Sequence, residues 1–272
     1  MAEKNSIVTA LANPTRFLAL SARVLPWVAG LSALLLLAGL WLVFFRVPDD
    51  YQQGATVRIM YIHVPAAWLS LFLYAMMTGS AIGTLVWRHP LADVAQKAAA
   101  PIGAAFTFLC LVTGAIWGKP MWGTWWVWDA RLTSELVLLL IYLGIIALWR
   151  AFEEPSAAAR AVAIMTLVGF VNIPIVKFSV DWWNTLHQPA SVFRLGGSSI
   201  DASMLWPLLV TAAGFTLLAV ALHLSGMRTE ILRRRVRALS LMEAQQRERA
   251  PAPGIIGNEN PGAENLRTGA LS

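Results

Sequence analysis

Residues 25–45 read LPWVAGLSALLLLAGLWLVFF, a run of 21 residues that contains no charged side chain. A helix of about 20 apolar residues crosses the hydrocarbon layer of a bilayer, where it satisfies its own backbone donors and acceptors. The run therefore predicts a membrane-spanning helix. Five later stretches share this character, at 65–87, 98–117, 132–149, 161–180 and 204–225. The sequence predicts an all-α, polytopic membrane protein with six transmembrane helices.

The composition agrees with this prediction. Hydrophobic residues make up 57% of the 272 residues and charged residues 13%, and a soluble core of this size cannot bury so much apolar side chain. The first span begins too late and is too long for a removed signal peptide, and no small-residue cleavage site follows it. We interpret it as an uncleaved anchor.

The distribution of Lys and Arg predicts the orientation of the spans. With the N-terminus inside, fifteen of the 21 Lys and Arg residues lie in inner segments, five lie in outer loops and Lys177 lies within a span. Cytoplasmic segments carry the excess of positive charge, so both termini are expected to be cytoplasmic. The net charge of +6 follows from this sidedness and from a basic segment at 228–237, expected to lie on anionic membrane lipid. No nucleic acid is needed to explain it.

Three segments divide the chain. Residues 1–24 are predicted as a cytoplasmic N-terminal segment, residues 25–225 as the membrane domain with a Trp-rich outer loop at 119–131, and residues 226–272 as a basic, partly disordered cytoplasmic tail. Disorder is expected beyond residue 250, where Pro, Gly and Asn are frequent. A Walker P-loop and a C-x-x-C-H signature are both absent, which argues against ATP hydrolysis by that route and against a c-type cytochrome.

Charged side chains at mid-membrane depth are nearly absent from the predicted spans. Lys177 lies near the outer end of the fifth span, four residues before Asp181, so the two can pair across one helical turn. We interpret them as an interface anchor pair in preference to direct ligands. Asn172 and Pro174 in the same span predict a kink. The single cysteine, Cys110, is interpreted as a small buried apolar residue.

The outer loop between the third and fourth spans reads KPMWGTWWVWDAR at 119–131. Four tryptophans fall within seven residues, and an acid follows them at position 129. An aromatic belt at the membrane interface explains one or two tryptophans but not this density. The loop offers a flat apolar platform for a large planar ligand such as haem, although quinones, lipids and partner helices also bind such surfaces. Asp129 is expected to fix the position of Arg131 or of a backbone N–H donor.

The four histidines divide by predicted side. His63 and His187 lie outside, at the depth of the tryptophan loop, and His89 and His223 lie inside. An outer pair matches the need of haem iron for one axial ligand on each face of the ring. His89 and His223 end their helices, where a polar or cationic group is favoured, and no ligand role is assigned to them. His63 and His187 are therefore the candidate iron ligands.

Haem also carries two propionates, which bind fixed cations. Arg58 lies five residues before His63, and Arg131 closes the tryptophan loop, so these two arginines are the first candidates. Lys119 and Arg194 are weaker ones, and any of the four can instead be a positioned interface charge.

The run WGTWWVWD at 122–129 fits the W-G-x-x-W-x-W-D pattern of the haem-handling proteins of cytochrome c biogenesis. With six spans and flanking outer histidines, residues 20–240 resemble the CcmC family of the bacterial cytochrome c maturation system. The resemblance implies that haem b is held at the periplasmic face of the inner membrane, with His63 and His187 as axial ligands. The cofactor-binding candidates are Trp122, Gly123, Trp125, Trp126, Trp128, Asp129, Arg58 and Arg131.

The resemblance also implies delivery of haem to the haem chaperone CcmE, and association with CcmA, CcmB and CcmD in an ABC transporter complex. Three functions are open: a protein that presents haem to a periplasmic acceptor, a permease subunit that exports haem or another substrate, and a scaffold. The spans have few polar or small residues for a conduit, and a scaffold leaves the histidine pair without purpose. The leading prediction is a haem presentation and transfer factor, not an enzyme in the ordinary sense.

Overall fold

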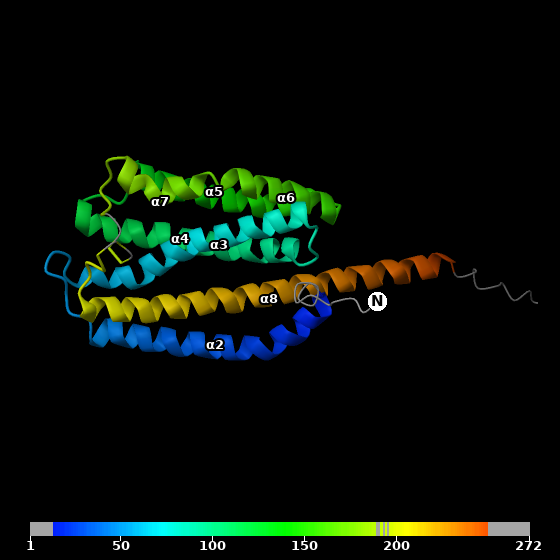
Figure 1. The fold of residues 1–272 in the computed structure, drawn as a ribbon, viewed down its shortest axis with the longest axis horizontal. Coiled ribbons are helices and arrows are strands. Elements are labelled where there is room, and N and C mark those ends of the chain that lie inside the picture. Colours follow the sequence, from blue (N-terminus) through cyan, green and yellow to red (C-terminus); the bar gives the residue numbers. More distant parts are fainter. Residues whose placement is uncertain (1–12, 189–190, 193, 195, 250–272) are drawn as a thin grey trace, which may run out of the picture. The chain divides into compact units, whose positions relative to one another are not determined.

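The computed structural model describes residues 13–188, 191–192, 194 and 196–249, which form α-helices joined by loops (Figure 1). The described residues contain six helical stretches long and apolar enough to cross a membrane, two of them composite, Ala55–Val86 and Pro155–Trp182. The predicted all-α fold with six transmembrane helices is confirmed. The elements are α2 (Pro14–Phe45), a 3₁₀ helix (Ala55–Ile59), α3 (Met60–Val86), α4 (Ala92–Trp122), α5 (Ala130–Ala151), α6 (Pro155–Gly169), α7 (Asn172–Trp182) and α8 (Ala202–Arg249).

The chain divides into two compact units, Met1–Ile231 and Leu232–Ser272. The first unit holds α2 to α7 and most of α8, together with the whole candidate site. In the second unit the end of α8 is described, and most of its side chains are exposed. Residues 226–249 of the predicted tail are helical, whereas the disorder predicted beyond residue 250 lies outside the described residues.

Polar caps and one glycine determine where several helices begin and end. The side chain of Asn13 accepts a hydrogen bond from Thr15 N at 2.8 Å and begins α2. Asp129 begins α5 and Glu154 begins α6 in the same way, because a side-chain oxygen satisfies backbone N–H groups that a first turn leaves free. Gly123 ends α4 with φ at 75°, a left-handed conformation that glycine adopts without steric cost.

The fifth predicted span is broken where a kink is expected. Helix α6 ends at Gly169 and α7 begins at Asn172, two residues before Pro174. Proline has no N–H to donate, and its ring clashes with the carbonyl group four residues earlier, which here belongs to Phe170. The Asn172 side chain donates to the Ser134 carbonyl at 2.9 Å and ties the break to α5. The break therefore divides this span into an inner helix, α6, and an outer helix, α7.

A buried cluster of α3, α4, α5 and α6 forms the core beneath the outer loops. Hydrogen bonds cross between these helices: Tyr142 OH donates to the Ser70 carbonyl at 2.7 Å, and Tyr74 OH donates to the Thr166 carbonyl at 3.1 Å. Lipid supplies little hydrophobic drive for helix association, so close packing and such polar contacts hold membrane helices together. The buried members are Tyr74, Met77, Ala99, Ala100, Ala104, Leu138, Tyr142, Ile145 and Val162.

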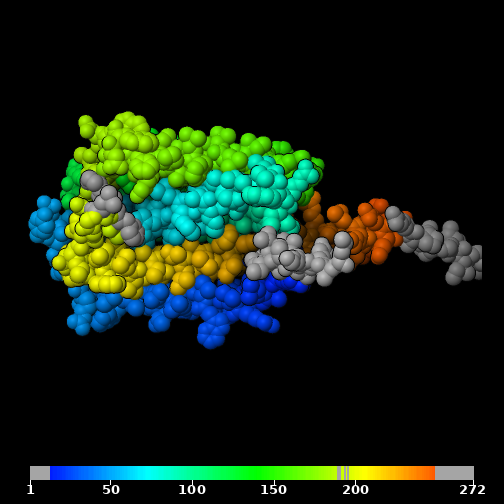
Figure 2. Space-filling model, viewed as in Figure 1, coloured from blue at the N-terminus to red at the C-terminus, as the bar shows by residue number. Residues whose placement is uncertain are grey.

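Helix α2 lies along α8, as Figure 2 also shows. Ser32 Oγ donates to the Gly214 carbonyl at 2.9 Å, and a Cβ atom built at Gly39 would overlap the side chain of Thr211. Large side chains elsewhere on α2, such as Trp27, are exposed. Their exposure suits contact with lipid, and the small residues explain how the two backbones approach each other.

Candidate functional site

A cavity of about 500 Å³ lies between α3, α4, α5, α7 and the segment after α7. This volume is within the range of sites for small molecules and cofactors. His63 and His187, which are 124 positions apart in the sequence, both line it. The other polar and tryptophan side chains in its wall include Trp68, Trp117, Trp122, Arg131, Glu135, Lys177 and Asp181.

His63 lies in the first turn of α3 and is held by the facing helix α4. Its Nδ1 atom lies 3.0 Å from the carbonyl oxygen of Cys110 and 3.1 Å from Thr113 Oγ1. The Thr113 hydroxyl donates to the Leu109 carbonyl at 2.6 Å, so its lone pairs face the imidazole. A carbonyl accepts only from a protonated nitrogen, which places the hydrogen of the neutral ring on Nδ1. The Nε2 atom is then left to bind a ligand.

Helix α4 also fixes the position of the His63 ring by close packing. A Cβ atom at Gly114 would lie 3.0 Å from His63 Cε1, so a larger residue would push the ring away. Trp117 meets the ring edge-on, with centroids 5.7 Å apart and an angle of 76°. Trp117 is itself held by a 3.0 Å hydrogen bond from Nε1 to Gln53 Oε1. His63 is therefore held in one place by packing and by its Nδ1 contacts.

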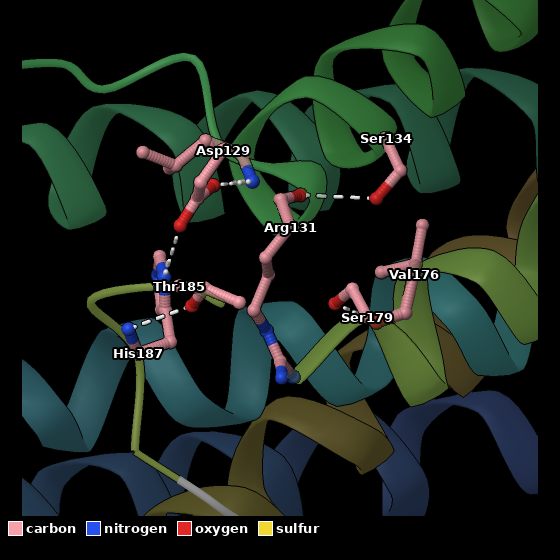
Figure 3. A network of polar contacts seen from close by, with 8 residues as sticks. Asp129, Arg131, Ser134, Val176, Ser179, Thr185 and His187 are labelled. Atoms are coloured by element: carbon pink, nitrogen blue, oxygen red, sulfur yellow. Dashed lines mark hydrogen bonds and ion pairs between the residues drawn. The ribbon is translucent and has the colours of Figure 1, made fainter. Parts of the chain in front are cut away.

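His187 lies outside the regular helices, in the segment between α7 and α8 (Figure 3). Its backbone N–H donates to Thr185 Oγ1 at 2.8 Å, and its Nδ1 atom lies 3.3 Å from Asp129 Oδ2. The Trp122 ring stands 4.8 Å from it at 64°. Burial lowers the pKa of His187 below its usual range, although the Asp129 carboxylate raises it. Burial therefore favours the neutral imidazole, which is the form that binds iron.

Asp129 uses its two oxygens for different contacts. Oδ1 accepts from Leu132 N at 2.8 Å and caps α5, and Oδ2 faces His187. The expected backbone donor is present, whereas no ion pair joins Asp129 to Arg131 within the described residues. Sequence reasoning did not identify the contact with His187, because 58 positions separate the two residues.

The four loop tryptophans lie in different surroundings. Trp122 lines the cavity, whereas Trp125 and Trp128 are 58% and 75% exposed and are not part of its wall. Trp126 packs edge-on against Trp128, with centroids 5.4 Å apart, and its buried Nε1 has no hydrogen-bond partner among the described residues. Gly123 turns the chain between Trp122 and the other three. One ring of the predicted platform thus faces the cavity, and two are exposed.

The two candidate arginines are placed differently. Arg131 lines the cavity, and no described carboxylate lies within ion-pair distance of it. Arg58 does not line the cavity: it pairs with Asp49 at 2.6 Å and also donates to the carbonyls of Val43 and Val47.

The weaker cation candidates, Lys119 and Arg194, are both outside the cavity wall. Lys119 Nζ donates to the Gly123 carbonyl at 2.9 Å, and Arg194 is exposed. Lys177 lines the cavity together with Asp181, and the ion pair expected between these two is not formed among the described contacts. The cavity wall therefore carries Arg131 and Lys177 as its cations.

Several lining residues were missed by sequence reasoning. Cys110, Gly114, Trp117 and Met121 follow one another on α4 at spacings of four, three and four, which puts them on one helical face. That spacing was the available signal. Glu135 was also missed, although it lies within a predicted span; its Oε1 accepts from Ser70 Oγ at 2.9 Å.

His89 follows the end of α3 (Met60–Val86), as predicted, whereas the prediction that His223 ends its helix is wrong, because α8 continues from Ala202 to Arg249. His89 and His223 are not part of the cavity wall, and His89 Nδ1 accepts from Leu91 N at 3.3 Å. Cys110 is buried, as expected of a small apolar residue, and its side chain borders the cavity.

Comparison with known proteins gives one family. The family model described as heme exporter protein C (CcmC) matches residues 7–242. A heme exporter protein C of Bradyrhizobium diazoefficiens is 66% identical over 250 residues, covering 92% of this chain and 95% of that protein. Relatives of the same name from Escherichia coli and Paracoccus denitrificans are 51% and 47% identical, covering 82% and 85% of this chain and 89% and 96% of their own lengths. The chain belongs to the CcmC family, that of heme exporter protein C.

Proposed function

We propose that this chain binds haem b in the cavity of His63 and His187 and delivers it to the haem chaperone CcmE. The observation that carries the proposal is that the imidazoles of His63 and His187 line the same cavity. Each Nδ1 atom has an acceptor of its own, and no described residue hydrogen bonds to either Nε2 atom. Two such nitrogens supply the two axial ligands of a six-coordinate haem iron.

The rest of the wall fits haem as well. Haem is planar and apolar across its faces, and Trp68, Trp117 and Trp122 provide aromatic surface in the cavity. Arg131 lines the cavity and has no described carboxylate as an ion-pair partner, so its guanidinium group is suited to bind a propionate. Among the described residues no group of three or more His, Cys, Asp or Glu side chains could hold a metal ion, and the iron ligands that we propose are the two histidines. The proposal for Arg58 is weaker, because Asp49 already neutralises it.

In this proposal haem is the molecule that is transferred, and the protein residues hold, orient and shield it. His63 and His187 would occupy both axial positions and keep oxygen from the iron. Trp122 would contact the macrocycle beside His187, where its ring lies. Arg131 would orient the propionate edge. These roles need no bond-forming chemistry from the chain itself, and we therefore assign no catalytic residue.

Delivery to a partner requires an exposed surface next to the cavity. Trp125 and Trp128 supply one, since large exposed aromatic groups mark protein contact sites. We assign this surface to the haem acceptor CcmE, and we place CcmA, CcmB and CcmD at other faces of an ABC transporter complex. The sidedness of Lys and Arg supports a periplasmic position for the site and cytoplasmic termini, in a bacterial inner membrane.

The optical spectrum of the protein purified from haem-supplied cells tests the proposal. The expected spectrum is that of six-coordinate, low-spin haem, and it should be lost or become five-coordinate in His63→Gly and in His187→Gly. His89→Gly and His223→Gly serve as matched controls and should keep the parent spectrum, because neither residue lines the cavity. The assignment would be refuted if the purified parent protein contained no haem, or if His63→Gly and His187→Gly kept the parent spectrum.

A further inference from the structure

The two candidate ligands differ in what holds their Nδ1 atoms. For His63 the acceptors are neutral, a backbone carbonyl and the Thr113 hydroxyl. For His187 the acceptor is the carboxylate of Asp129, at 3.3 Å. An ionised acceptor pulls the Nδ1 hydrogen more strongly than a carbonyl does, and this makes the opposite nitrogen a better electron donor. The two imidazoles are therefore unequal as donors.

The surroundings strengthen this difference. The side chain of Asp129 is 5% exposed and that of His187 17% exposed, so water screens their contact weakly. The carboxylate is also fixed: its other oxygen accepts from Leu132 N at 2.8 Å at the start of α5 (Figure 3). A contact of 3.3 Å is longer than the usual charge-assisted hydrogen bond, as hydrogen bonds in ligand-free sites often are.

We propose that Asp129 is a positioning residue that acts on haem through His187. It holds the imidazole as the Nδ1–H tautomer, turns Nε2 to the iron, and makes His187 the more strongly donating of the two ligands. A stronger donor favours the ferric over the ferrous state. This inference rests on the proposed haem site, and it gives the acid of the tryptophan motif a role that involves no contact with haem.

Asp129 both caps α5 and contacts His187, and substitutions can remove these two roles separately. Asn is as good a helix N-cap as Asp, so Asp129→Asn keeps the start of α5. Its amide has a single oxygen, which cannot serve both Leu132 N and His187 Nδ1, and its nitrogen carries no charge. Asp129→Ala removes both contacts. Thermal stability should therefore fall only in the variant that loses the helix cap, Asp129→Ala. The reduction potential should change in both variants, because both lose the negative charge.

The midpoint potential of the haem-loaded protein is the first measurement. Asp129→Asn should raise the potential by about 59 mV for each tenfold loss in the preference for ferric over ferrous haem, and a loss of about tenfold is expected. Its melting temperature should stay near that of the parent protein, whereas Asp129→Ala should melt at a lower temperature. The control is Thr113→Val, which removes a neutral acceptor while the Cys110 carbonyl remains, and it should shift the potential less. An unchanged potential in Asp129→Asn would overturn the inference.

A second measurement needs no haem. Nitrogen NMR of the haem-free protein with labelled histidine reports the ring tautomer, and the His187 signal is assigned by its loss in His187→Gly. In the parent protein Nδ1 of His187 should carry the hydrogen, and in Asp129→Asn the Nε2–H form should become populated. The same tautomer in both proteins would refute the role of Asp129, even in a variant that no longer retains haem. If the parent protein never binds haem but its His187 tautomer differs from that in Asp129→Asn, the proposed function is refuted, whereas the effect of Asp129 on the His187 ring is supported.

Discussion

His63 and His187 line the same cavity, but different kinds of structure hold them. His63 belongs to a helix of the bundle, and the facing helix α4 fixes its ring through Cys110, Thr113 and Gly114. His187 lies in a segment without regular structure and depends on side chains of the tryptophan loop for its position. The packing of two helices thus holds one candidate ligand, and the tryptophan loop holds the other. If the proposed haem site is correct, substitutions in the tryptophan loop should affect the iron mainly through His187.

Removal of either ligand is expected to have the largest effect. His63→Gly and His187→Gly should each lower haem occupancy by more than about tenfold, since loss of an outer partner of a ligand alone costs that much. Added imidazole should restore the six-coordinate spectrum. Restoration should need less imidazole in His63→Gly, because Thr113, Gly114 and Trp117 wall the vacated space. The reverse order would break the comparison between a ligand held by two helices and one held by the tryptophan loop.

A methyl group on α4 should disturb His63 selectively. In Gly114→Ala the new Cβ atom would lie 3.0 Å from His63 Cε1, so the ring must shift. Overpacking of this kind costs about 1–3 kcal/mol, and haem affinity should fall accordingly when measured by titration. The matched control is Gly79→Ala on α3, where no atom outside the surrounding helix backbone lies within 4 Å of the new group. Equal affinities in the two variants would show that His63 is not held by packing.

The sequence predicted the spans, and it predicted the two histidines that line the cavity as candidate ligands, but not how these histidines are held. Runs of apolar residues determine the spans because lipid requires them, and this signal is local. The contact between Asp129 and His187 depends on how α5 and the segment after α7 meet in space, which no local pattern encodes. Likewise, the density of tryptophans predicted a platform, but the turn at Gly123 decides which rings face the cavity.

Acid should affect His187 in a predictable direction. The pKa of His187 lies below its usual value, chiefly because of burial, so folding favours the neutral ring. Its contribution to stability is then fully present above the ordinary histidine pKa of about 6.5 and is lost as the pH falls through the lowered value. The haem-free protein should therefore melt at lower temperatures in acid, and His187→Gln should melt with a weaker dependence on pH. Parallel curves for the two proteins would show that His187 does not titrate in this way.

The smallest effect on haem retention is expected for the exposed tryptophans. The Trp128 ring is 75% exposed and packs on Trp126, whereas Trp122 lies 4.8 Å from His187 and lines the cavity. Trp128→Ala should therefore keep haem occupancy within about twofold, since surface substitutions usually change free energies by no more than about 0.5 kcal/mol.

Trp122→Ala should lower occupancy further but leave the six-coordinate spectrum of the remaining haem unchanged, because its ring contacts the macrocycle and not the iron in the proposed site. When the rate of haem transfer to CcmE is measured instead of haem retention, Trp128→Ala should have the larger effect of the two variants. Transfer depends on the exposed surface, so Trp128→Ala should slow it while Trp122→Ala mainly reduces the amount available. If Trp128→Ala lost haem as readily as Trp122→Ala, the four rings would act as one platform, as the density of tryptophans in the sequence alone suggests.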